Sequence, residues 1–99
     1  MNTYIVRVID NYSHKIRKEV IVKATNSDYL RKRVIKDMLN NDVVLEIFKM
    51  LKDHKELMGS MWSIGKNVEY RVATSGNRNS DTHLVNPKTG RLDEIKWRD

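Results

Sequence analysis

Two runs rich in β-branched residues, 4–10 and 18–24, constrain the fold of this 99-residue chain more than any other feature. Valine, isoleucine and tyrosine favour extended backbone, and a polar stretch with its tip near residues 13–15 separates the runs. Matching the two runs places their valines on one face, whereas a slip of one residue would place Glu19 there. The sequence therefore predicts an N-terminal β-hairpin with one apolar face. The predicted pairs are Val8 with Val20, Val6 with Val22, and Tyr4 with Ala24.

The middle of the chain carries two helix signals. Thr25 and Asp28 have the spacing of a capping box, which predicts a helix over residues 28–39. Two asparagines then interrupt the pattern, Asp42 is positioned to cap a second helix, and Gly59 is positioned to end it. Each predicted helix has an apolar stripe at helical spacing. The stripes are Leu30, Val34, Ile35, Met38 and Leu39 in the first helix, and Val44, Ile47, Phe48, Leu51 and Met58 in the second.

The last third of the chain alternates apolar and polar residues in short segments, which predicts strands. Gly65 begins a two-residue turn between the first two of these segments. Pro87 and Gly90 fit a turn between the last two, with a positive φ at Gly90. Residues 75–81 contain no apolar residue and predict a loop. The predicted strands are 61–64, 68–73, 82–85 and 91–97.

These elements predict one domain, residues 1–99, of the α+β class. In this arrangement an N-terminal β-hairpin precedes two helices, antiparallel strands follow, and both helices pack on one sheet. The chain length is sufficient for one modest core. The predicted core residues are Val6, Val8, Val20, Val22, Val34, Ile35, Met38, Phe48 and Leu51.

Positive charge is concentrated in the first third of the chain. Residues 1–33 hold eight bases and three acids, and so carry +5 of the total +6. A surface of one sign attracts a polyanion, although a run such as Arg31-Lys32-Arg33 is also typical of a solvated helix face. The predicted role of these bases is contact with phosphate groups or with an acidic protein. The candidate binding residues are Arg7, Lys15, Arg17, Lys18, Lys23, Arg31, Lys32 and Arg33.

No motif in the sequence names a reaction, a metal or a cofactor. His14, His54 and His83 lack the paired spacing of a zinc site, and the chain contains no cysteine. The adjacent Asp93 and Glu94 point to opposite faces of a strand, which makes them a poor acid–base pair. We therefore expect a non-enzymatic protein without a metal or cofactor.

The sequence also bears on location. Its longest apolar runs are only a few residues, too short to span a bilayer, and the N-terminus lacks a signal-peptide pattern. Because small secreted domains often depend on disulfides, the absence of cysteine favours the cytoplasm. We expect no membrane partner; the oligomeric state stays open.

The N-terminal third resembles small bacteriophage accessory proteins. The resemblance rests on the strand at residues 4–10, the short hairpin, the strand at 19–24 and the helix start that follows. It covers about a third of the chain. It implies a protein that acts in the cytoplasm of a bacterial host, where it binds and inhibits or redirects host enzymes, nucleic-acid machinery or defence complexes.

Residues 61–64 with 70–72 resemble the central strands of RelE-like ribonuclease toxins, which are also small, basic and α+β. This second resemblance implies a ribonuclease in which Arg71, His83 and Lys66 bind phosphate and transfer protons.

Three functional hypotheses follow, and the first is favoured. The N-terminal basic face binds nucleic acid, or a protein surface that normally binds it. Alternatively, the protein inhibits a host enzyme or defence complex through an exposed sheet face that carries Ile5, Ile9 and Ile21 beside Arg7 and Lys23. The third hypothesis is the ribonuclease.

Overall fold

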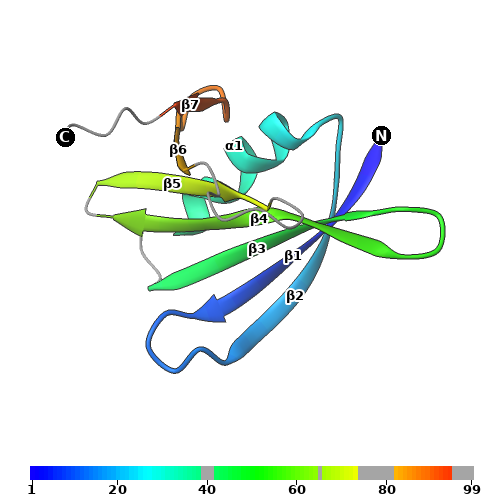
Figure 1. The fold of residues 1–99 in the computed structure, drawn as a ribbon, viewed down its shortest axis with the longest axis horizontal. Helices are drawn as coiled ribbons and strands as arrows, with labels where there is room; N and C mark the ends of the chain where they lie inside the picture. The colour runs from blue at the N-terminus through cyan, green and yellow to red at the C-terminus, as the bar shows by residue number, and fades with distance from the viewer. Residues whose placement is uncertain (39–41, 65, 74–81, 95–99) are drawn as a thin grey trace.

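The computed structural model describes residues 1–38, 42–64, 66–73 and 82–94, which form seven strands and one helix (Figure 1). The strands are antiparallel and belong to a single sheet. The elements are β1 (Asn2–Asp10), β2 (Ile16–Ala24), α1 (Ser27–Met38), β3 (Val43–Met50), β4 (Lys55–Ile64), β5 (Asn67–Val72), β6 (Thr82–Val85) and β7 (Leu92–Glu94).

The strand order is β2-β1-β3-β4-β5-β6-β7, so the β1–β2 hairpin forms one end of the sheet. After β2, α1 leads the chain back to β3, which pairs with the other side of β1 (Figure 1). From β3 onward each strand pairs with the next one in the sequence. The predicted α+β arrangement with two helices is therefore wrong. The molecule is mainly an antiparallel sheet, and α1 is the only helix among the described residues.

The predicted second helix is replaced by the β3–β4 hairpin. Val43, Leu45 and Ile47 point to the face that α1 covers, and they are buried. The residues between them point to the opposite face, where Phe48 is also buried. An inner strand with apolar residues on both faces lacks strict alternation, and its spacing imitates a helical stripe. Gly59 ends no helix, because it lies within β4 against the ring of Tyr70.

The N-terminal hairpin forms as predicted, with its register shifted by two residues. Val6 lies opposite Val20, rather than Val22 as predicted, and Tyr4 lies opposite Val22. The pairing of the two strands has an irregularity between Val8 and Ile9, and in the turn the N–H of His14 donates to the carbonyl of Asp10, with His14 at φ 60°. A shift of two residues preserves the face of every side chain, so the predicted apolar face is still correct.

The predicted C-terminal strands are confirmed where the structure describes them. β4 pairs with β5 across the predicted turn, with Ser63 opposite Val68. β6 and β7 form the second hairpin, and Gly90 has the predicted positive φ, 73°. The predicted loop 75–81 and the end of the strand predicted at 91–97 lie outside the described residues.

The main core lies between α1 and the sheet. Val6, Val34 and Ile35 are buried there as predicted, and Val8 and Val22 are partly buried against them. The other predicted core residues are not described as part of the main core. Val20 is 39% exposed, Leu51 is half-buried, and Phe48 is buried on the opposite face of the sheet. The side chain of Met38 lies outside the described residues.

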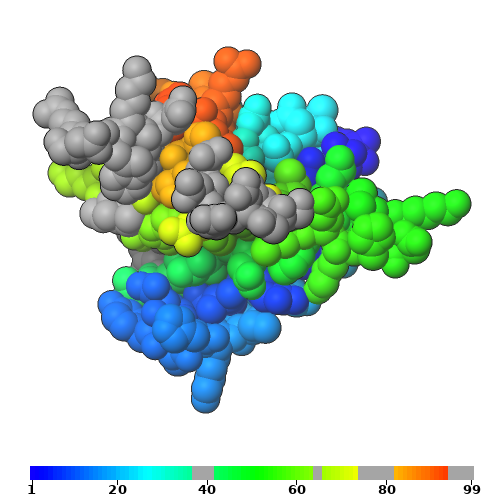
Figure 2. All heavy atoms as spheres, in the orientation of Figure 1, coloured from blue at the N-terminus to red at the C-terminus, as the bar shows by residue number. Residues whose placement is uncertain are grey.

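The β3–β4 hairpin projects from one end of the molecule (Figures 1 and 2). No helix of the described residues is long and apolar enough to cross a membrane.

Candidate functional site

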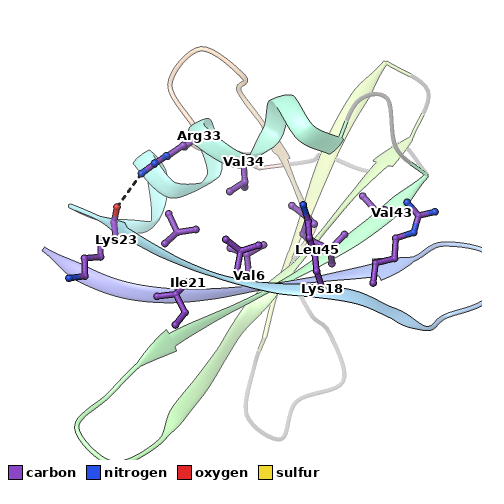
Figure 3. A pocket seen from close by; sticks show the side chains of 12 residues that line it. Val6, Lys18, Ile21, Lys23, Arg33, Val34, Val43 and Leu45 are labelled. Atoms are coloured by element: carbon purple, nitrogen blue, oxygen red, sulfur yellow. Dashed lines mark hydrogen bonds between the residues drawn. The ribbon is translucent and has the colours of Figure 1, made fainter.

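A groove of about 690 Å³ lies between the edge strand β2 and α1 (Figure 3). It exists because α1 covers only one end of the β1–β2 hairpin. At the covered end, Tyr4 and Ala24 are 2% and 1% exposed. Toward the turn, Val20 is 39% exposed and Lys18 is exposed. The apolar face of the hairpin thus extends beyond the helix and remains accessible there.

The groove has an aliphatic lining. Val6 and Val8 of β1 and Val43 and Leu45 of β3 lie beneath it, while α1 contributes Val34 (Figure 3). Among the lining residues from β2, Val20 and Val22 face the groove, whereas Ile21 borders it at the strand edge with its side chain on the opposite face (Figure 3).

Every charged residue among those described as lining the groove is a base. Arg17, Lys18 and Lys23 come from β2, and Arg33 comes from α1. The one acid of β2, Glu19, accepts a hydrogen bond from Arg7 Nε at 2.8 Å. Since Glu19 is opposed by this base, the groove presents a net positive rim around an apolar floor.

The β1–β2 turn holds Arg17 at one end of the groove. The carboxylate of Asp10 accepts hydrogen bonds from the backbone N–H groups of Tyr12 and Ser13, both at 2.9 Å. Its other oxygen accepts a bond from Arg17 Nε at 3.0 Å. The Ser13 N–H, the Arg17 guanidinium and the Tyr12 N–H hold the pKa of Asp10 well below its usual range. Arg17 is therefore partly neutralised, unlike Lys18.

Four of the eight predicted binding residues line this groove, and two others are at the surface elsewhere. The groove residues are Arg17, Lys18, Lys23 and Arg33. Lys15 is exposed in the β1–β2 turn, and Lys32 is exposed on α1.

The structure places Arg7 on the face of the sheet opposite α1. Its guanidinium lies between Glu19 and Glu46 and over the ring of Phe48, with Cζ 4.8 Å from the ring centroid. This base is therefore engaged within the sheet. On the same face Ile21 is 70% exposed, whereas Ile5 and Ile9 are half-buried, so the apolar patch predicted there is centred on β2.

Arg31 is only 4% exposed and belongs to the interior. Its Nε donates to the carbonyl oxygen of Gly90 at 2.9 Å, and its Nη2 binds the carboxylate of Asp28. The guanidinium also lies over the Tyr70 ring, 5.0 Å from its centroid. Arg31 cannot reach a phosphate group in this conformation. The spacing of Asp28 and Arg31, three residues apart on a helix, was the sequence signal for this internal pair.

The residues of the ribonuclease hypothesis do not converge. His83 pairs across the sheet with Tyr70, on the face covered by α1, whereas Arg71 is on the opposite face with Trp62. Among the described residues, no group of three His, Cys, Asp or Glu side chains is placed to hold a metal ion. The described geometry gives this hypothesis no support.

Comparison with family models, curated proteins and solved structures found no match to this chain.

Proposed function

We propose that the protein is a non-enzymatic binding module whose groove between β2 and α1 holds an acidic segment of a partner protein. The observation that carries this proposal is the combination of an aliphatic floor with a rim of four bases. The floor supplies binding free energy through burial of apolar side chains. The rim favours acidic partners and disfavours basic ones.

The aliphatic floor favours a protein over a nucleic acid as the partner. Unpaired nucleobases bind a protein by stacking on aromatic rings, whereas the apolar side chains that line the described groove are aliphatic. Binding an acidic surface of a host enzyme or defence complex is one form of this function, in keeping with the resemblance to bacteriophage accessory proteins. The absence of cysteine supports a cytoplasmic location, which we include in the proposal.

Nucleic acid is the second candidate partner, because six of the predicted bases remain at the surface. Contacts with duplex phosphates release counterions, so the affinity falls steeply with salt. Four to six such contacts correspond to a slope of log K against log salt of roughly −4 to −5. These bases are Lys15, Arg17, Lys18, Lys23, Lys32 and Arg33.

Two variants of equal net charge test the proposal. The groove variant replaces its four bases with glutamine, and the control variant replaces four exposed bases outside the groove. Both variants lose the same charge, so a non-specific effect of charge weakens both equally. The groove variant is Arg17→Gln, Lys18→Gln, Lys23→Gln and Arg33→Gln. The control variant is Lys52→Gln, Lys66→Gln, Lys88→Gln and Arg91→Gln.

Each protein is used to capture partners from nuclease-treated bacterial lysate, and the captured partner is then titrated in purified form. We expect the groove variant to bind at least about tenfold more weakly than the control variant, which stays within about threefold of the wild type. Equal losses in both variants contradict the groove as the site. Loss of all partners after nuclease treatment favours nucleic acid.

A further inference from the structure

We propose that the partner segment binds as an extended acidic peptide that pairs with the free edge of β2 and adds an eighth strand to the sheet. This inference rests on the proposed function and names the form of its ligand. Strand addition to an exposed sheet edge is a common mode of peptide recognition: the backbone supplies hydrogen bonds and alternate side chains supply specificity.

The strand β2 lies exposed at the edge of the sheet. This strand pairs with β1 and forms one edge of the sheet, and no other described strand lies beside it. β2 is nine residues long, whereas β7 at the opposite edge has three. Natural proteins commonly shorten or cover such edges to prevent unwanted pairing. Here β2 offers a long edge on which Ile16 and Ile21 are 55% and 70% exposed, interspersed with charged residues.

The backbone of β2 directs hydrogen-bonding groups away from β1. Arg33 Nη1 donates to the carbonyl oxygen of Lys23 at 3.5 Å, so this carbonyl points toward the groove and away from β1. Peptide groups alternate along a strand, and the N–H and C=O of residues 21 and 19 therefore point the same way. An added strand can pair with these groups without breaking the β1–β2 ladder.

The groove lies beside this edge of the sheet. Side chains of an added strand alternate between the two faces of the sheet. One set would lie over Val20, Val22 and the floor of the groove, which favours apolar residues there. The other set would lie beside Ile21 on the opposite face.

Charge determines the class of peptide. Lys23 lies on the face of β2 that carries Ile21, where the acid of β2, Glu19, is bound by Arg7, and Lys18 and Arg33 border the groove. Acidic side chains on the face of Ile21 would thus lie beside Lys23, and the peptide as a whole would be attracted by the bases that border the groove. A second copy of β2 is a poorer match, because that strand itself carries three bases and one acid.

The test uses nine-residue probe peptides, the length of β2, that alternate valine with glutamate or valine with lysine. The key variant is Ile21→Pro, which removes one outward-facing N–H but leaves the bonds to β1 in place. Ile21→Val is the matched control, because it also changes the side chain but retains the N–H. Fluorescence anisotropy gives the affinities, and thermal melting confirms that both variants are folded.

We expect the glutamate probe to bind the wild type and Ile21→Val with affinities within about twofold of each other. Binding to Ile21→Pro should be at least about tenfold weaker, because a proline blocks strand pairing. The lysine probe should not bind. Hydrogen exchange at the amides of Ile21 and Lys23 should slow when the glutamate probe is bound.

A second measurement covers the case in which Ile21→Pro fails to fold. Two glutamate probes are N-methylated, one at every valine and the other at every glutamate, so that one of them lacks all donors facing β2. Strand addition predicts that one methylated probe loses binding and the other retains it.

The remaining outcomes would overturn strand addition, and they separate it from the proposed function. If Ile21→Pro and both methylated probes bind normally while the groove variant does not, the groove binds side chains only and the proposed function stands. If the glutamate probe does not bind the wild type, strand addition is rejected. The proposed function is rejected as well only if the groove variant and the control variant lose the same affinity for the captured partner. A wild-type dimer that Ile21→Pro dissociates identifies a second copy as the occupant instead.

Discussion

Arg31 Nε donates a hydrogen bond to the carbonyl oxygen of Gly90 at 2.9 Å, and this bond joins two residues 59 positions apart. It connects the N-terminal half of α1 to the β6–β7 turn. Gly90 has φ 73°, and a Cβ at this position would collide with the carbonyl oxygen of Asp28. The close approach of turn and helix therefore requires glycine and places its carbonyl within reach of Arg31.

Arg31→Gln should lower the free energy of unfolding by about 1.5–3 kcal/mol, the cost of losing a hydrogen bond to a charged group. Urea denaturation measures this change. Lys32→Gln is the matched control: this neighbouring base is exposed, and its replacement should change stability by less than about 0.5 kcal/mol. Equal effects of the two substitutions would show that the contact with Gly90 contributes nothing to stability.

The same residue shows where the sequence informs the fold and where it does not. The helix start at Thr25–Asp28 and the apolar stripe predict α1, because these signals lie within one element. The spacing of Arg31 and Asp28 indicates one contact of Arg31, but Gly90 lies in a distant turn, so no local pattern indicates the contact with its carbonyl. The prediction of a second helix failed for a related reason. Val43, Leu45 and Ile47 form a strand because β1 and β4 pair with it on either side, and these strands come from other parts of the chain.

The candidate site was predictable in its charge and not in its shape. Composition alone identifies Arg17, Lys18, Lys23 and Arg33 as members of a basic segment. The groove floor includes Leu45, which pairs opposite Val8 in a strand far along the chain. Only the assembled sheet brings these elements together.

Phe48→Ala should lower the free energy of unfolding by about 3 kcal/mol, near the lower end of the range for buried aromatic residues. Phe48 is 8% exposed, and both Arg7 Cζ and Lys55 Nζ lie 4.8 Å from its ring centroid. The substitution removes apolar burial and two cation–π contacts together. Met50→Ala on the same strand face, at a residue 40% exposed, should cost clearly less. A loss below about 1 kcal/mol for Phe48→Ala in denaturant melts would contradict its structural role.

Tyr70 makes the free energy of unfolding depend on pH in the alkaline range. Burial raises the pKa of its phenol from 10.0 to about 12. Between these values the unfolded chain loses the proton while the folded chain keeps it, so stability falls as pH rises. The slope approaches about 1.4 kcal/mol per pH unit. Tyr70→Phe removes this contribution. The difference in unfolding free energy between wild type and variant should therefore decrease from pH 10 to about 12, and parallel pH profiles would contradict the assignment.

Asp10 makes the free energy of unfolding depend on pH in the acidic range. Here stability falls as pH falls, whereas for Tyr70 it falls as pH rises. Its pKa is held below the ordinary 3.8 by the Ser13 N–H, the Arg17 guanidinium and the Tyr12 N–H. In this case the carboxylate stabilises the fold above pH 3.8, and the stabilisation is lost as pH falls toward the folded-state pKa. Asp10→Asn retains an oxygen for the turn and removes the charge that faces Arg17. Urea unfolding at several pH values should show the variant less stable near neutral pH, with a difference that shrinks below pH 3.8. A difference that stays constant throughout the acidic range would mean that the carboxylate charge does not stabilise the β1–β2 turn.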